Sequence, residues 1–105
     1  MLVIAPHADD EVVGCGGTIA REHARGAEVT LIVMGAGGIR HRHLAEAVSL
    51  DDRLAELDAA ARRLGVARSR VLFPGRDMRL ETVPMLDLVS ALDEVLAADA
   101  YDECY

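Results

Sequence analysis

The chain has 105 residues, of which 51% are hydrophobic, which suffices for one compact core and is too little for two ordinary domains. Eighteen acidic residues against eleven basic ones give a formal net charge of -7, and because this charge repels a phosphate backbone, we expect no nucleic-acid partner. The start of the chain lacks the pattern of a signal peptide and no stretch approaches the roughly 20 apolar residues that span a bilayer, so we expect no membrane partner and a cytoplasmic location.

Short runs of apolar and β-branched residues alternate along the chain with longer segments of helical spacing. The runs are typical of strands buried on both faces, and the longer segments carry apolar residues on one stripe. In chain order, the expected elements are a strand at 2–5, a helix at 16–25, a strand at 29–33, a helix between residues 52 and 65, a strand at 71–73 and a helix from Pro84.

Three strand-then-helix units predict a parallel sheet, because parallel neighbours need crossover connections of about this length. Residues 101–105 follow the third helix where a fourth strand is due, and the chain stops there. We therefore expect an α/β fold, a three-layer Rossmann-like parallel sheet flanked by helices that lacks its carboxyl-terminal part. Residues 1–105 would form this single, incomplete domain.

Charged residues crowd into positions 6–11, directly after the first predicted strand, where the sequence reads PHADDE. In an open parallel sheet, ligands bind beyond the carboxyl ends of the strands, so the location favours a functional site. One imidazole and three neighbouring carboxylates suit a hard or borderline divalent cation such as Zn²⁺, which also relieves the repulsion among the acids.

The spacing within this loop predicts separate roles. His7 and Asp10 are three residues apart, so in a tight turn both can aim at one cation. Asp9 would point elsewhere and could hold a water whose pKa the cation lowers toward about 7, which makes a hydrolytic centre. The alternative is structural, since acidic residues before a helix also cap its free N–H groups and meet its dipole. The histidine and the position at a strand end favour the metal site.

Glycines and further histidines raise two more questions. Gly14, Gly16 and Gly17 do not complete a Gly-x-Gly-x-x-Gly pattern, so we interpret them as close helix-to-sheet packing and not as a nucleotide site. A loop with the sequence His41-Arg42-His43 follows the second predicted strand, and its histidines either lean toward the metal or are simply solvated. His23, inside the first helix, is expected at the surface.

The opening motif, followed by GCGGT at residues 14–18, resembles the amino-terminal signature of the PIG-L or LmbE-like family of zinc-dependent N-acetylglucosaminyl deacetylases. The likeness extends over almost the whole chain, through the RLAE of residues 53–56, the LGV of 64–66 and the FPGRD of 73–77. The resemblance implies a hydrolase that removes acetyl from a small-molecule N-acetylated sugar.

The same resemblance implies roles for individual residues. His7 and Asp10 would bind zinc, Asp9 would act as general base, and Arg53 and Asp77 would touch the sugar substrate. From the sequence, a helix-surface ion pair for Arg53 and a turn role for Asp77 remain equally open. His with carboxylate also suits Fe²⁺, Mn²⁺ or Co²⁺, so another divalent metal is an alternative to zinc.

Two departures from the family pattern matter. Ala8 stands where the family most often has proline, which removes no ligand. The family takes its third zinc ligand from a His-x-x-His type motif beyond the fourth strand, and this chain ends before such a segment, so it offers two of about three ligands. The alternatives to an active deacetylase are an inactive half-domain that binds metal weakly, or an assembly module whose open sheet edge pairs with another copy in a homo-oligomer.

Overall fold

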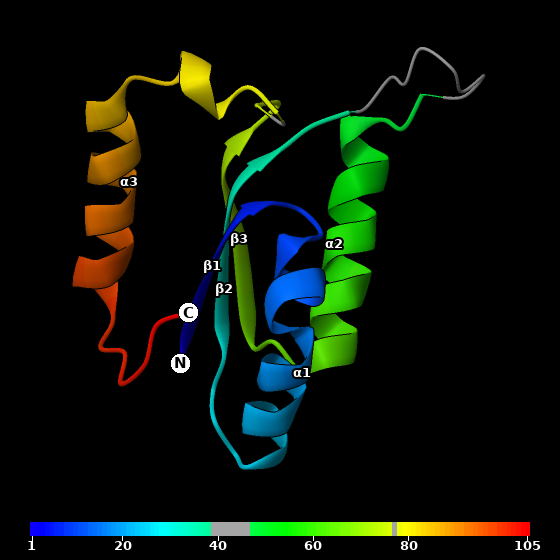
Figure 1. The fold of residues 1–105 in the computed structure, drawn as a ribbon, viewed down its shortest axis with the longest axis vertical. Coiled ribbons are helices and arrows are strands. Elements are labelled where there is room, and N and C mark those ends of the chain that lie inside the picture. Colours follow the sequence, from blue (N-terminus) through cyan, green and yellow to red (C-terminus); the bar gives the residue numbers. More distant parts are fainter. Residues whose placement is uncertain (39–46, 77) are drawn as a thin grey trace.

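The computed structural model describes residues 1–38, 47–76 and 78–105. A parallel sheet of three strands in the order β1-β2-β3 forms its centre, with β1 at Leu2–His7, β2 at Thr30–Ala36 and β3 at Arg68–Pro74 (Figure 1). His7 lies opposite Gly35 in the first pair of strands, and Gly35 lies opposite Phe73 in the second. The carboxyl ends of all three strands therefore meet at one edge of the sheet.

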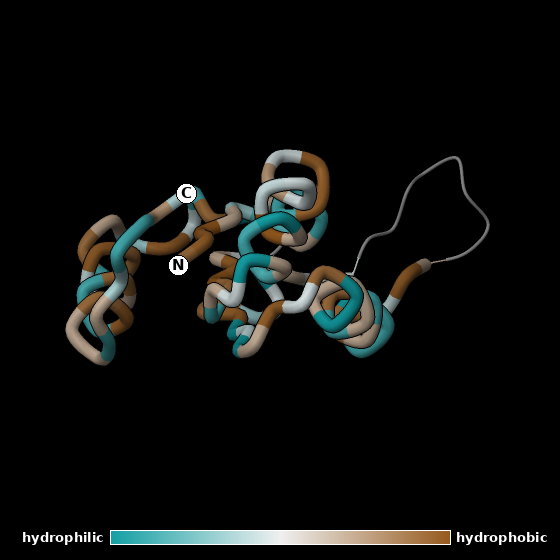
Figure 2. Tube along the Cα trace, turned by 90° about the horizontal axis from the view of Figure 1, so that it is seen from below, coloured by the Kyte–Doolittle hydropathy of each residue, from teal (hydrophilic) through white to brown (hydrophobic). Residues whose placement is uncertain are grey.

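Helices cover both faces of this sheet. The structure contains α1 (Asp10–Ala24), α2 (Leu50–Leu64), a short 3-10 turn η1 (Leu80–Thr82) and α3 (Met85–Ala98). Both views place α1 and α2 on one side of the strands and α3 on the other (Figures 1 and 2). Two apolar clusters fill the space between these layers, one including Ile19, Leu57 and Ala61 and the other including Val95. The predicted three-layer α/β fold is thus confirmed.

Local sequence explains why the best predicted elements form. Every residue of β2 is buried, as expected for a middle strand covered on both faces. Ser49 caps α2, since its hydroxyl accepts from the Asp52 N–H at 3.1 Å while the Asp52 carboxylate accepts from the Ser49 N–H at 3.3 Å. Gly65 ends the helix with a left-handed φ of 81°.

The prediction that the first helix starts at residue 16 is wrong, because α1 begins at Asp10. The carbonyl of Asp9 accepts from the N–H groups of Val12 and Val13, each at 3.0 Å, so the helix forms through the glycines despite their low helix propensity. The interpretation of these glycines as close helix-to-sheet packing is also wrong. A Cβ on Gly16 would lie 3.8 Å from Leu64 of α2 and not against the sheet, and within the described ranges Gly14 and Gly17 face open space.

The last residues run beside β1, as predicted for a fourth strand. The Leu2 N–H donates to the carbonyl of Glu103 at 2.9 Å and the Tyr105 N–H donates to the carbonyl of Leu2 at 3.0 Å, in a parallel bridge of Leu2 with Cys104. Because the helix before this segment lies on the opposite face from α1 and α2, the winding reverses between β1 and residues 103–105. Ligands of doubly wound sheets bind at such a reversal. None of the helices described here has the length and apolarity to cross a membrane.

An ionic cluster joins three parts of the chain near the opposite end of the strands. Arg68 Nη2 lies 2.7 Å from Asp99 Oδ2 and 2.9 Å from Glu28 Oε1. The hydrogen bond from Arg68 is the main cause that holds the pKa of Asp99 below its usual value, and the same bond raises the pKa of Arg68. The cluster therefore favours the charged carboxylate in the folded state.

We expect Gly65→Ala to destabilise the fold. Its left-handed backbone costs a residue with a Cβ about 1–2 kcal/mol, and that Cβ would lie 2.2 Å from Cδ2 of His23, which must move. Gly26→Ala is the matched control, because Gly26 has a φ of 91° and open space around it. Urea midpoints should fall further for Gly65→Ala than for Gly26→Ala. Equal losses would show that the exposed His23 ring simply swings aside.

The Arg68 cluster predicts a pH dependence of stability. A carboxyl whose pKa is lowered on folding stabilises the fold above its ordinary pKa of about 3.9 and loses that contribution as the pH falls through the lowered value. Urea midpoints of the wild type should therefore fall on acidification below pH about 4, and Arg68→Gln should flatten this fall. Arg70→Gln removes the same charge from the same strand and should keep the wild-type slope. A slope unchanged by Arg68→Gln would contradict this assignment.

Candidate metal and catalytic site

The two predicted metal ligands meet at the carboxyl end of β1. His7 Nδ1 lies 3.4 Å from Asp10 Oδ2, and the His7 backbone N–H donates to the same oxygen at 3.1 Å. The strand ends at His7 and α1 begins at Asp10, so the turn between them folds the two side chains together. Their side chains are 30% and 47% exposed, so solvent reaches this pair.

This pair fits part of a zinc site. A tetrahedral Zn²⁺ with bonds of about 2.0–2.2 Å holds two ligand atoms roughly 3.3–3.5 Å apart, and the observed separation of 3.4 Å falls in that range. Imidazole nitrogen and carboxylate oxygen are both ordinary zinc donors. Across the parts of the chain that the structure describes, no group of three such side chains gathers. The candidate ligands His41 and His43 lie outside the described residues.

Asp9 takes the position before the first residue of α1, with an unusual backbone conformation. Its φ is 133° and its ψ is -26°, a region that residues with a Cβ rarely adopt. The side chain makes no capping hydrogen bond to the helix, and its Oδ2 lies 3.5 Å from Nη2 of Arg53. The carboxylate is 65% exposed, so it can contact a substrate or water beside the His7–Asp10 pair.

The three neighbouring acids have different partners. The Asp10 carboxylate accepts from His7, Asp9 extends toward Arg53, and the Glu11 carboxylate accepts from the backbone N–H of Asp9 at 2.9 Å. Simple capping of helix N–H groups therefore does not account for the acidic run. Of the three, only Glu11 performs a capping task, by reaching back to the residue before the helix.

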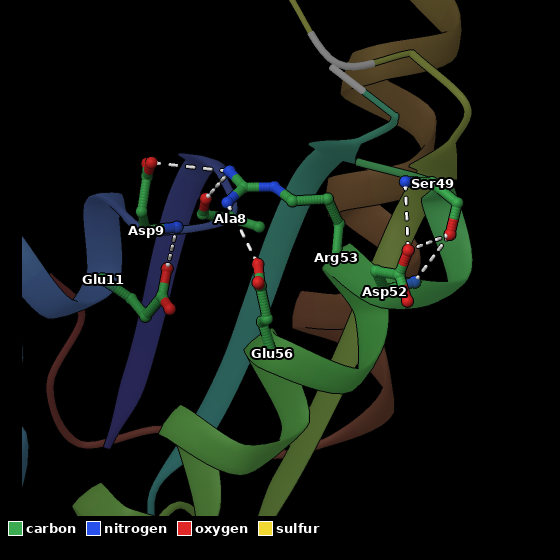
Figure 3. Close-up of polar contacts among 7 residues, drawn as sticks. All are labelled: Ala8, Asp9, Glu11, Ser49, Asp52, Arg53 and Glu56. Atoms are coloured by element: carbon green, nitrogen blue, oxygen red, sulfur yellow. Dashed lines mark hydrogen bonds and ion pairs between the residues drawn. The ribbon is translucent and has the colours of Figure 1, made fainter. Parts of the chain in front are cut away.

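Arg53 reaches from α2 to the turn after β1 (Figure 3). Its Nη2 donates to the carbonyl of Ala8 at 2.7 Å, and its Nη1 lies 3.5 Å from Glu56 Oε2. The ion pair along the helix, which the sequence left open as an alternative, is therefore present. The side chain is 17% exposed, and its Nε is buried without a partner among the described residues. The contact with the turn was not predicted. A role of Arg53 in binding sugar stays a prediction, as does that of Asp77, which lies outside the described residues.

A small cavity lies between the start of α1 and α2, and its volume is about 110 Å³. Its lining consists of Ala8, Asp9, Glu11, Val12, Arg53, Glu56, Leu57 and Ala60. Glu11 had no role of its own in the sequence-based predictions, although it is only 2% exposed. A signal for its burial was present, because Glu11 shares a helical stripe with Cys15 and Ile19.

Comparisons with known proteins identify the family of the chain. The chain matches the PIG-L family, described as GlcNAc-PI de-N-acetylase, over residues 2–102. It is also similar to 1D-myo-inositol 2-acetamido-2-deoxy-alpha-D-glucopyranoside deacetylases of Salinispora arenicola and of a Nocardioides species, at 36% and 37% identity over 81 residues. These matches take in 69% of this chain and 26% and 27% of the two relatives.

Two solved structures share the fold. A conserved protein from Thermus thermophilus is 35% identical with a TM-score of 0.54, over 69% of this chain and 30% of that one. The N,N'-diacetylchitobiose deacetylase from Pyrococcus horikoshii, solved with its inhibitor, is 32% identical with a TM-score of 0.57, over 77% of this chain and 34% of that one. The chain thus spans about a quarter to a third of the length of these relatives. With a family match over nearly its whole length, it belongs to the PIG-L family.

Proposed function

We propose that this site serves a metal-dependent deacetylase, which hydrolyses the acetamide of an N-acetylated amino sugar or its conjugate. The observation that carries the proposal is the His7–Asp10 pair at the carboxyl end of β1, whose donor atoms are spaced as zinc ligands are. Three named relatives support the substrate class, since each is called a deacetylase and each name describes an N-acetylated sugar compound.

In this proposal His7 and Asp10 hold zinc, or another divalent metal, and Asp9 is the general base. Bound zinc would supply a Lewis acid that makes a water more acidic and stabilises negative charge on the attacked carbonyl oxygen. Asp9, exposed beside the pair, takes the proton of the water as it attacks the acetyl carbon. Asp9 then returns this proton to the amide nitrogen as the C–N bond breaks, so that the products are acetate and the protonated amine.

The remaining partners are part of the same proposal. Asp77 would contact the sugar, and Arg53 would either contact the sugar or hold the turn that carries Asp9. The chain would act in the cytoplasm, without nucleic-acid or membrane partners. The two cysteines, Cys15 and Cys104, are both free thiols.

A second candidate follows from the incomplete ligand set. Because the described residues bring together two metal donors and not three, the chain would bind metal weakly without turnover. Alternatively, the chain would be an assembly module that self-associates at the outer edge of residues 103–105, whose inner edge pairs with β1. Sedimentation of the purified chain separates these cases, since an assembly module sediments as an oligomer.

Zinc binding should depend on both members of the pair. We expect Zn²⁺ titrated into the metal-free chain to bind at least about tenfold more weakly to His7→Ala and to Asp10→Ala than to the wild type, because each change removes a ligand. His23→Ala removes an exposed histidine of α1 and should bind as the wild type does. Isothermal titration calorimetry makes the measurement. Unchanged affinity in Asp10→Ala would refute the proposed ligand set.

Asp9→Asn tests the general base separately from the metal. We expect the rate of amine release from an N-acetylglucosamine conjugate to fall about 10²–10⁴-fold, because the amide takes up no proton, while zinc affinity stays within about threefold. Asp58→Asn makes the same change on the exposed face of α2 and should leave the rate unchanged. If the wild type binds zinc but releases no amine, the second candidate is favoured. Full activity of Asp9→Asn would show that Asp9 is not the general base.

A further inference from the structure

The peptide bond between Ala8 and Asp9 is held from both of its polar ends. Its N–H belongs to Asp9 and donates to Glu11 Oε2 at 2.9 Å, and its C=O belongs to Ala8 and accepts from Arg53 Nη2 at 2.7 Å (Figure 3). Glu11 comes from α1 and Arg53 from α2, so two different helices fix the orientation of one peptide plane.

That orientation sets the backbone angle of Asp9. The angle φ measures rotation about the N–Cα bond, so it relates the held peptide plane to the Asp9 Cα and its side chain. Its value of 133° is unfavourable for a residue with a Cβ, and such a conformation persists only when its surroundings determine it. Without the two hydrogen bonds the turn would relax, and the Asp9 carboxylate would move with it.

Both holding groups are well placed for this task. Glu11 is 2% exposed, so little water competes for the hydrogen bond that its Oε2 accepts. The Arg53 side chain is 17% exposed, and its Nη groups are directed to Ala8, Asp9 and Glu56 while its Nε finds no acceptor within the described residues. Both Nη groups of Arg53 are therefore engaged by residues of this protein.

We propose that Glu11 and Arg53 are positioning residues, which grip the Ala8–Asp9 peptide from opposite ends and thereby aim the Asp9 carboxylate. This inference rests on the proposed role of Asp9 as general base. A positioning role for Arg53 and a sugar contact by Arg53 predict changes in different kinetic constants when Arg53 is substituted. Loss of a positioning group lowers kcat, because misplacement by about 1 Å costs roughly 10²-fold, whereas loss of a substrate contact raises KM.

The experiment combines amide hydrogen exchange at Asp9, followed by NMR, with deacetylation kinetics on an N-acetylglucosamine conjugate. For Glu11→Ala and Arg53→Met we expect at least about tenfold faster exchange of the Asp9 amide, a kcat reduced about 10- to 100-fold and a KM within about threefold of the wild type. Glu11→Gln keeps an acceptor oxygen and Arg53→Lys keeps a donor, so both should recover part of kcat. Arg62→Met removes an exposed arginine of α2 and should change nothing.

Each outcome decides the question. Unchanged exchange of the Asp9 amide in both Glu11→Ala and Arg53→Met would contradict the proposal that these residues hold the peptide. A raised KM with unchanged kcat in Arg53→Met would make Arg53 a substrate contact. If either variant fails to fold, Glu11→Gln and Arg53→Lys give the same readouts in milder form. If the wild type shows no deacetylation, the proposed function fails, and the exchange of the Asp9 amide still tests the grip independently of activity.

Discussion

Parallel pairing of β1 on both of its sides is the constraint on which the site depends. β2 lies along one side of β1 and residues 103–105 lie along the other. Parallel neighbours must be entered from the same end, so the crossovers run over the faces of the sheet and the carboxyl ends collect at one edge. Since α1 and α2 cover one face and α3 the other, His7 ends the strand at which the direction of winding changes. The charged residues 6–11 therefore lie at the position where ligands bind in such sheets.

What the sequence could predict follows from the range of each interaction. The buried runs of β1 and β2 were visible because burial on both faces demands apolar residues. The beginning of β3 was missed because Arg68, Ser69 and Arg70 are exposed, so hydrophobicity did not mark them. α1 starts earlier than predicted, at Asp10, because backbone capping at Asp9 and the contact of Gly16 with α2 outweigh the low helix propensity of the glycines.

The same reasoning applies to the site. The contact between His7 and Asp10 was predictable, because residues three positions apart in a tight turn lie close together. The bond from Arg53 to the carbonyl of Ala8 joins residues 45 positions apart and exists only because α2 lies beside the turn. No pattern along the chain reports such a contact. The family resemblance implies that Arg53 touches the sugar, which stays a prediction, and the structure adds a hydrogen bond from Arg53 to the turn.

The backbone of Asp9 carries an evolutionary consequence. Glycine adopts a positive φ at little cost, so it would relieve the strain at this position and raise the stability of the fold. It would also delete the carboxylate that the proposed chemistry requires. Selection for a durable protein and selection for hydrolysis therefore oppose each other at a single residue. A variant released from the proposed chemistry would gain stability from glycine at this position.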